Sequence, residues 1–300
     1  MNVFAVIVLF ISSAAFGQSE IVYPAPESNG NNRFADLVEL LSVALKRTVP
    51  EYGSYRLVPS KLEMNEERSL AELKEGALVD VIWSSTSAEK ETTFIPVRIC
   101  LRKGMLGYRV ALIESSNQAL IDKVKTIDDL RSLTVGQGLG WGDVDVYRAN
   151  GIPVLTASYE SLFAMVAHDR FYLYPRGINE VFAEHAAKKS SLPDLGIEKR
   201  LLLYYQWPYY FFVNKNNREL ATRIDLGLRR MVKDGSFDAI FWKYNGNAIL
   251  KANLSQRRVI RLDNPLLPEG TPLDTPYWLS PDKLQGYISQ QSRRARHSDL

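Results

Sequence analysis

The sequence predicts an α/β protein with two lobes. Strand-like and helix-like segments alternate along most of the chain, which is typical of sheets with crossover helices. The alternation begins near residue 20 and begins again near residue 107, so it describes two α/β units. With 300 residues, of which 46% are hydrophobic and 24% charged, the chain is long enough for each unit to bury a core.

An export signal precedes the first unit. Residues 3–16 are uncharged and mostly apolar, and the small residues Ala15 and Gly17 stand before Gln18. This stretch is too short for a membrane span but suits the apolar region of a secretory signal peptide. We therefore expect residues 1–17 to be removed and a soluble, periplasmic protein to remain. Because no cysteine lies near the cleavage point, a lipoprotein anchor is not expected.

The first unit has three predicted strands and two predicted helices. The first helix shows apolar residues on one face from Phe34 to Leu45 and is ended by Pro50, and Gly76 follows the second. The segments are a strand at 21–24, the first helix, a strand at 55–58, a helix at 68–74 and a strand at 79–83. In parallel sheets built this way, ligands bind beyond the carboxyl ends of the strands.

Two loops of the first unit are therefore candidates for ligand contact, 24–32 and 84–92. The first contains Glu27, which is a candidate by its position alone. The second contains Ser84 and Thr86, whose hydroxyls either bond a ligand or cap the following turn.

A glycine-rich loop in the second unit is the main candidate for a binding wall. Glycines at 136, 138, 140 and 142 precede Asp143 and a run that reads as the start of a helix. Gly138 and its neighbours let backbone N–H groups approach a ligand, and Trp141 offers a flat apolar face. Asp143 either contacts the ligand or only caps its helix. The spacing does not fit G-x-G-x-x-G or G-K-[ST], so nucleotide binding is not predicted, and a plain connecting turn is the alternative.

The rest of the second unit repeats the α/β pattern. The chain then crosses back through the aromatic run 201–212, which we expect to pack in the core and hinge. A long helix from Asn217 to Asp234 and a shorter one at 237–244 follow, and the proline-rich part beyond Leu262 is expected to be mostly irregular and to wrap the first lobe. The preceding segments of the unit are strands at 108–113, 153–155 and 171–174 and helices at 127–130 and 158–167.

The composition excludes several functions. The 37 basic and 34 acidic residues are mixed along the chain, so no basic face for nucleic acid is predicted, and the basic stretch 292–297 reads as a frayed terminus. Cys100 has no partner for a disulfide and is expected to be a buried thiol. The three histidines show no metal-binding spacing and no G-x-S-x-G elbow exists, so no metal, cofactor or catalytic centre is expected.

Three segments of the chain resemble the periplasmic solute-binding proteins of the amino-acid ABC-transporter type, which have the type II fold. They are residues 70–83, 127–138 and 220–237, in the order and spacing typical of that family. The resemblance implies two lobes, each a mixed sheet flanked by helices, and a hinge of two crossing segments that closes over a ligand. It divides the mature chain into lobe 1 at 18–107 and 210–300 and lobe 2 at 108–209.

The resemblance also implies where a ligand would be held. Family members carry a Ser/Thr-x-x-Arg turn whose arginine grips the ligand carboxylate, and here Ser87-Ala-Glu-Lys90 stands in its place. The family aspartate that holds the ligand ammonium corresponds to Arg176. Two cations facing the cleft suit an anionic or zwitterionic ligand, and Glu180 would neutralise part of that charge. Arg109, at the crossing, points into the cleft or pairs with an acid.

These observations predict a monomeric binding protein that delivers a small polar molecule to a membrane permease of an ABC transporter. A periplasmic sensor that presents its ligand to a receptor kinase or cyclase is the alternative, since both roles use the same closure. A dehydratase-like enzyme, with Glu27, Asp143 or Glu180 as acid or base, is the third possibility.

Overall fold

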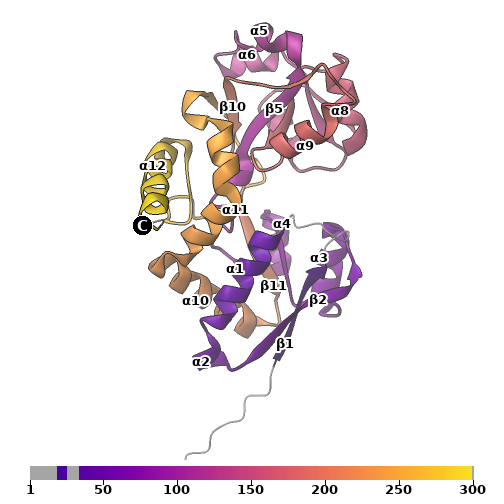
Figure 1. Cartoon of the computed structure of the whole chain (residues 1–300). Helices are drawn as coiled ribbons and strands as arrows, with labels where there is room; N and C mark the ends of the chain where they lie inside the picture. The colour runs from indigo at the N-terminus through magenta and orange to yellow at the C-terminus, as the bar shows by residue number, and fades with distance from the viewer. Residues whose placement is uncertain (1–18, 26–33, 299–300) are drawn as a thin grey trace, which may run out of the picture.

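The computed structural model describes residues 19–25 and 34–298, with side chains up to residue 291. Figure 1 shows two α/β lobes joined at a narrow waist, as the sequence predicts. The expected signal peptide and Glu27 lie outside the described residues. Among the described residues, no helix combines the length and the hydrophobicity that a membrane crossing requires.

The first lobe holds two small sheets flanked by helices. One sheet pairs β1 with β2 in parallel, and the other has the order β3-β11-β4 with antiparallel neighbours. The elements are β1 (Ser19–Ala25), α1 (Ala35–Lys46), α2 (Val49–Tyr52), β2 (Tyr55–Glu63), α3 (Glu66–Glu75), β3 (Val81–Ser85), α4 (Ala88–Thr93), β4 (Phe94–Val97), β11 (Tyr209–Asn214) and α10 (Arg218–Asp234).

Close helix packing forms the core of this lobe. The apolar face of α1 is buried as its periodicity predicts, and it packs against α10. A side-chain carbon at Gly227 would lie 2.2 Å from the carbonyl oxygen of Ala44, so only glycine permits this approach. Gly76 ends α3 in the left-handed conformation, which is the role that the sequence assigned to it.

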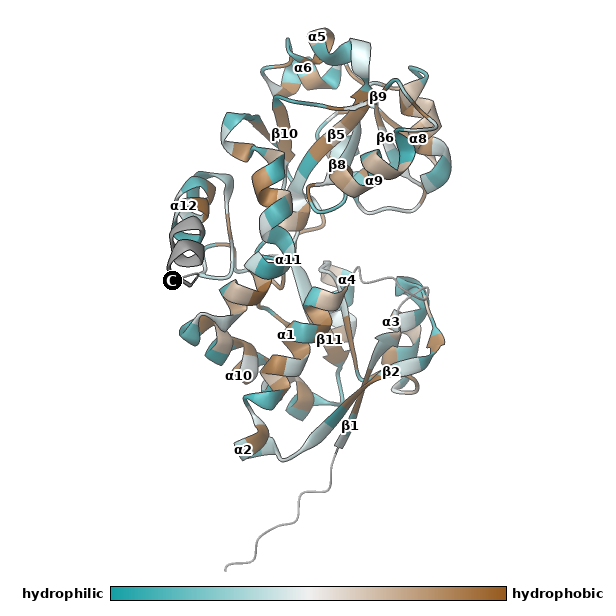
Figure 2. Cartoon of the chain, viewed as in Figure 1, coloured by the Kyte–Doolittle hydropathy of each residue, from teal (hydrophilic) through white to brown (hydrophobic). Residues whose placement is uncertain are grey.

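The second lobe is built on a mixed sheet with the path β12-β10-β5-β8, to which β9 adds beside β5. Figure 2 shows β5 and β10 as largely hydrophobic strands, and both are buried along their length apart from Glu114. The elements are η1 (Met105–Gly107), β5 (Tyr108–Glu114), η2 (Ser115–Asn117), α5 (Gln118–Ile121), α6 (Ile127–Arg131), β6 (Val135–Gly138), α7 (Asp143–Ala149), β7 (Val154–Ala157), α8 (Tyr159–Ala167), β8 (Tyr174–Gly177), α9 (Val181–Lys188), β9 (Leu195–Ile197), β10 (Leu201–Tyr204), η3 (Leu254–Gln256) and β12 (Arg258–Arg261).

Several expected elements differ in their bounds, two of them with a consequence for the fold. The segment 171–174 was expected to be a strand, but β8 begins only at Tyr174, and Leu173 makes a single bridge to Val135. The helix expected at 237–244 is longer, because α11 (Ser236–Ala252) continues through Gly246. Its first half packs in the first lobe through Phe237, and its second half packs in the second lobe through Ile249. The helix therefore joins the two lobes beside the hinge.

The part of the chain beyond residue 250 also differs from expectation. The predicted division placed all of 210–300 in lobe 1, but β12 pairs in parallel with β10 in the sheet of lobe 2. The proline-rich part is irregular only as far as Ser280, and α12 (Pro281–Ser298) follows. Proline at the first position of a helix is favourable, so Pro281 starts this helix rather than preventing it.

The two expected hinge segments meet backbone to backbone. The Tyr205 N–H donates to the carbonyl oxygen of Gly107 at 3.2 Å. A side-chain carbon at Gly107 would lie 1.8 Å from the carbonyl oxygen of Tyr205, which is far inside van der Waals contact. The contact between the crossing segments therefore requires glycine at this position.

Replacing Gly107 with alanine is expected to lower the free energy of unfolding by at least about 1–3 kcal/mol, because the new methyl group forces the crossing segments apart. Urea denaturation followed by circular dichroism measures the change. Gly286 is the matched control, since it lies in α12 with no heavy atom within 4 Å of its added carbon. There alanine should raise stability by about 0.5–1 kcal/mol. Equal effects at both sites would contradict the close-contact explanation.

Candidate functional site

A cleft of about 800 Å³ lies between the two lobes next to the hinge. Its walls come from the first turns of α3 and α4, from both crossing segments, from the glycine loop and from the end of β8. The lining residues are Phe34, Asn65, Glu66, Glu67, Leu70, Ser85, Thr86, Ser87, Glu89, Lys90, Arg102, Leu106, Arg109, Gly140, Trp141, Gly142, Asp143, Arg176, Glu180, Trp207, Tyr209 and Leu266. The size of the cleft matches a small-molecule site.

Lys90 lies on the first-lobe wall, but its charge is already paired. Its Nζ donates to Glu66 Oε1 at 2.8 Å, to Ser84 Oγ at 2.6 Å and to the Ser85 carbonyl oxygen at 3.0 Å. Ser87 caps α4 by accepting from the Lys90 N–H, which fixes the turn that carries the lysine. The three donor positions of the ammonium group are therefore in use inside the protein.

Arg109 and Asp143 form a buried ion pair on the second-lobe wall. Arg109 Nη2 lies 2.8 Å from Asp143 Oδ2, and Arg109 Nε donates to the Tyr205 hydroxyl at 2.8 Å. The Tyr205 hydroxyl in turn donates to Asp143. Burial alone would lower the pKa of Arg109, but Asp143 and the neighbouring tyrosines raise it above its ordinary value. For Tyr205, burial has the opposite effect and raises the pKa well above its usual range, so this hydroxyl stays protonated.

Arg176 is held by two glutamates and three aromatic rings. It donates from Nε and Nη2 to the two oxygens of Glu184, each at 2.7 Å, and its Nη2 lies 3.2 Å from Glu180 Oε2. The guanidinium carbon lies 4.8 Å from the Trp141 ring centre, with Tyr159 and Tyr174 nearby. Burial would lower the pKa of Arg176, but both glutamates raise it. The cation is thus fixed in a cage of the second lobe.

Arg102 is a fourth cation of the cleft that the sequence did not single out. Both oxygens of Asp36 accept from it, at 2.7 and 2.8 Å, and both residues are buried. Its guanidinium carbon also lies 5.7 Å from the Phe34 ring centre and 5.8 Å from that of Tyr209. Residues 36 and 102 are far apart in sequence, so no local pattern could have indicated this pair.

Among the described residues that line the cleft, the acidic ones outnumber the basic ones. The acids on its walls are Glu66, Glu67, Glu89, Asp143 and Glu180, and the bases are Lys90, Arg102, Arg109 and Arg176. Asp36 and Glu184 add two further carboxylates directly behind the arginines. Glu67 and Glu89 are exposed, and within the described part of the chain neither carboxylate has an ion-pair or hydrogen-bond partner. The charges that remain open to a ligand in this region are therefore negative.

The other predicted residues take different places. Thr86 lines the cleft, but its hydroxyl donates to Glu91 at 2.6 Å. Ser84 is fully buried behind Lys90, so it supports the wall instead of forming it. Gly138 is also not a lining residue, because it lies beneath Trp141, where a side-chain carbon would be 2.2 Å from the indole ring. Its role in the structure is to seat that ring.

Several apolar lining residues were not predicted as site residues, and Trp207 and Leu266 are two of them. Trp207 belongs to the aromatic run that was expected to pack in the hinge, and Leu266 belongs to the proline-rich part. Both approach the glycine loop, since a side-chain carbon at Gly142 would lie 3.0 Å from Trp207 and 3.7 Å from Leu266. Alternating aromatic residues in the run could have indicated that one side chain faces the cleft.

Within the part of the chain that is described, no group of three or more histidine, cysteine or acidic side chains is arranged to hold a metal ion. Cys100 is a buried free thiol, as the sequence predicts. Burial raises the pKa of this thiol to about 11.

Asp143→Asn is expected to lower the free energy of unfolding by about 3–5 kcal/mol, because it leaves the Arg109 guanidinium buried without its counter-charge. Chemical denaturation measures the loss. Asp128→Asn is the matched control, since the Asp128 side chain is 80% exposed in its pair with Arg131. Its effect should stay within about 1 kcal/mol. A loss at Asp143 as small as that at Asp128 would contradict the buried-pair interpretation.

Comparison with known proteins supports the fold. No protein-family profile matches the chain, and no curated protein sequence matches it. Among solved structures, an ancestral arginine-binding protein bound to arginine is 20% identical with a TM-score of 0.50, and the match covers 76% of this chain and 98% of that one. An ancestral arginine-binding protein bound to glutamine is 19% identical with a TM-score of 0.50, and the match covers 77% of this chain and 98% of that one. The YckB protein of Bacillus subtilis is 18% identical with a TM-score of 0.51, and the match covers 82% of this chain and 96% of that one. The chain thus has the two-lobed α/β fold of amino-acid-binding proteins that the sequence resemblance predicts.

Proposed function

We propose that the protein is an extracytoplasmic solute-binding protein. Its interlobe cleft binds a small polar molecule with a positively charged group, and a zwitterion is the ligand class that we favour. The observation that carries the proposal is the charge state of the cleft. Among the described residues, the four cations on its walls are paired with carboxylates, whereas Glu67 and Glu89 are open. An anion without a positive group would meet a net negative cleft, which disfavours it.

A carboxylate on the ligand still has donors to meet. Arg109 and Arg176 contact other described residues through their Nε and Nη2 atoms, so Nη1 of each arginine is left to donate. Hydrogen bonds from a guanidinium to a carboxylate are among the stronger polar contacts in proteins. Of the two ligand types that the sequence suggested, the geometry therefore favours the zwitterion over the anion.

Delivery to a membrane transporter is the role we infer for the bound form, and presentation to a membrane receptor is the alternative. Both need the same occupied cleft, so the partner separates them. Co-purification of the ligand-loaded protein with a permease complex would support transport, and co-purification with a receptor kinase or cyclase would support sensing. We infer that the protein is not an enzyme, because Asp143 and Glu180 contact buried guanidiniums instead of standing free as acid or base.

A thermal-shift screen of amino acids, organic acids and small peptides tests the proposal, with arginine and glutamine first. A ligand at 100 times its Kd should add about 2.7 kcal/mol to the stability of the folded state. We expect zwitterionic or cationic compounds to raise Tm and citrate or succinate to leave it unchanged. Stabilisation by citrate or succinate alone would contradict the charge argument. A screen without any stabilising compound would contradict the solute-binding role.

Removing an open carboxylate should weaken binding of the compounds found. Glu67→Gln and Glu89→Gln are each expected to raise the Kd by roughly two- to fivefold at low salt, because an exposed charge contributes about 0.5–1 kcal/mol. The effect should shrink at high salt. Isothermal titration calorimetry measures the Kd. Glu75→Gln, at the far end of α3 and not on the cleft wall, should leave the Kd unchanged. An equal change of the Kd in all three variants would contradict a direct attraction between these carboxylates and the ligand.

A further inference from the structure

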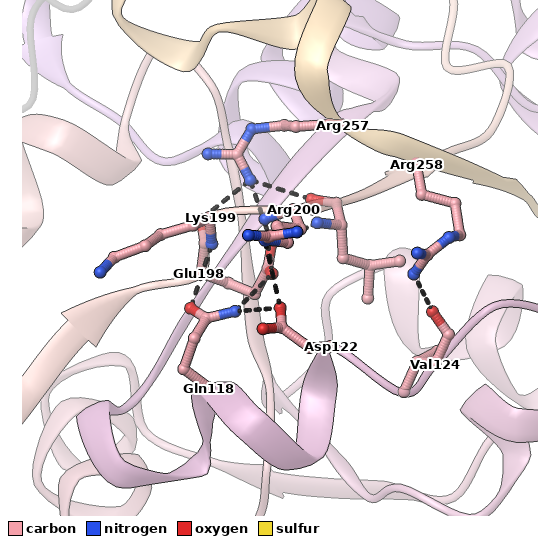
Figure 3. A network of polar contacts seen from close by, with 9 residues as sticks. Gln118, Asp122, Val124, Glu198, Lys199, Arg200, Arg257 and Arg258 are labelled. Atoms are coloured by element: carbon pink, nitrogen blue, oxygen red, sulfur yellow. Dashed lines mark hydrogen bonds and ion pairs between the residues drawn. The ribbon is translucent and has the colours of Figure 1, made fainter.

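The C-terminal segment, residues 257–287, is attached to both lobes and to the hinge. Its start is fixed in the second lobe by a buried ion pair, which Figure 3 shows from close by. Glu198 is fully buried, and its carboxylate accepts from Arg257 Nη1 at 3.0 Å, from Gln118 at 3.1 Å and from the Arg200 N–H at 2.7 Å. Arg257 also donates to the carbonyl oxygens of Glu198 and Leu201. Such a satisfied network holds η3 and β12 firmly on this lobe.

The segment then runs along the cleft. Asn150 of the second lobe makes two hydrogen bonds with the backbone of Asp263. Its Nδ2 donates to the Asp263 carbonyl oxygen at 2.8 Å, and its Oδ1 accepts from the Asp263 N–H at 3.0 Å. Asn264 donates to the carbonyl oxygen of Gln206 in the second crossing segment at 2.7 Å. Leu266, two residues after Asn264, lines the cleft. These residues are therefore fixed to the second lobe and the hinge.

The next part of the segment is attached to the first lobe. Trp278 is buried in the same apolar core as Phe94 and Phe212 of that lobe, and Leu273 and Tyr277 pack against this core. The Trp278 ring also lies directly over Gly104 in the first crossing segment, within 3 Å of where a side-chain carbon would be. A large buried aromatic side chain of this kind makes a strong apolar anchor.

Polar contacts reinforce this anchor at the hinge. Lys103 is buried and donates to the Pro276 carbonyl oxygen at 2.6 Å and to Asp238 of α11 at 2.8 Å. The Leu279 N–H donates to the Lys103 carbonyl oxygen at 2.9 Å, and the Tyr108 hydroxyl donates to the Leu279 carbonyl oxygen at 2.8 Å.

The helix that ends the described chain packs beside the hinge. Tyr287 of α12 contacts Phe241 and Trp242 of α11, with ring centres 6.1 and 6.0 Å apart. In Figure 1, α12 lies to the left of α11, whereas α3 and α9 lie to its right. The C-terminal segment therefore lies beside the covalent connections between the lobes. It has its own attachments to the second lobe and to the first lobe.

We propose that the C-terminal segment is a brace that holds the two lobes in a nearly fixed orientation and so keeps the cleft preformed. A hinge of two crossing segments can rotate at a few backbone dihedrals. Here a rotation must also be absorbed by residues 264–277, or else it moves Trp278 against its core or Asp263 against Asn150. Both of these contacts are buried or fully bonded. Release of the first-lobe anchor should therefore free the lobes to sample a wider range of orientations.

Distances between spin labels on the two lobes test the brace without any ligand, so the outcome is independent of the proposed function. Glu75→Cys in the first lobe and Lys123→Cys in the second place the labels at exposed sites. Cys100 is only 1% exposed and burial raises the pKa of its thiol to about 11, so it should not be labelled near pH 8. Pulsed electron double resonance then gives the distribution of interlobe distances in the full chain and in its variants.

The brace predicts a narrow distribution for the parent protein and one at least about twofold broader for Trp278→Ala. Phe94→Ala is the matched control, since it opens a cavity in the same apolar core and leaves the segment attached. Lys103→Met, which removes the bonds to Pro276 and Asp238 and retains the apolar stem, is the second variant, should Trp278→Ala not fold. Unchanged distributions in the variants that fold, or equal broadening in Phe94→Ala, would overturn the proposal.

Discussion

A guanidinium or ammonium group that leaves water needs a counter-charge, and this requirement determines what the cleft offers to a ligand. Arg102, Arg109 and Arg176 are buried, and each contacts a carboxylate of its own lobe. The cations therefore stiffen the walls and contribute little net positive charge. The open charges belong to glutamates in the first turns of α3 and α4. Because these cations are paired, the free charge that a ligand meets on the described walls is negative, although the sequence had suggested two free cations.

The sequence predicted most of the fold because the relevant signals are local. Periodic apolar residues in α1, the left-handed glycine after α3 and the restart of the α/β pattern each depend on neighbouring residues. The sequence signal was weaker for elements whose position depends on contacts with residues distant in sequence. Strand β12 is a short segment whose place is set by pairing with β10, and α12 is stabilised by packing on α11. The sequence analysis predicted no element at β12 and assigned the region of α12 to irregular chain.

The candidate site was predictable in position and not in charge. The position of the glycine loop identified Trp141 and Asp143, and the family resemblance identified Lys90 and Arg176. All four line the cleft. Their partners are Glu66, Glu184 and Arg109, at separations of 24, 8 and 34 residues, and only the folded chain brings them together. Charge at a position therefore follows from sequence, whereas the free charge that a ligand meets depends on tertiary pairing.

The brace and the paired cleft have a common physical consequence. A site that keeps one geometry need not order its walls when a ligand arrives, so less conformational entropy is lost on binding. Trp141 stacked on Arg176 and the Arg109–Asp143 pair are ordered before any ligand is present. If the C-terminal segment also fixes the separation of the walls, selectivity must come from the fit of a ligand to a rigid space. Little movement of the lobes would then accompany binding.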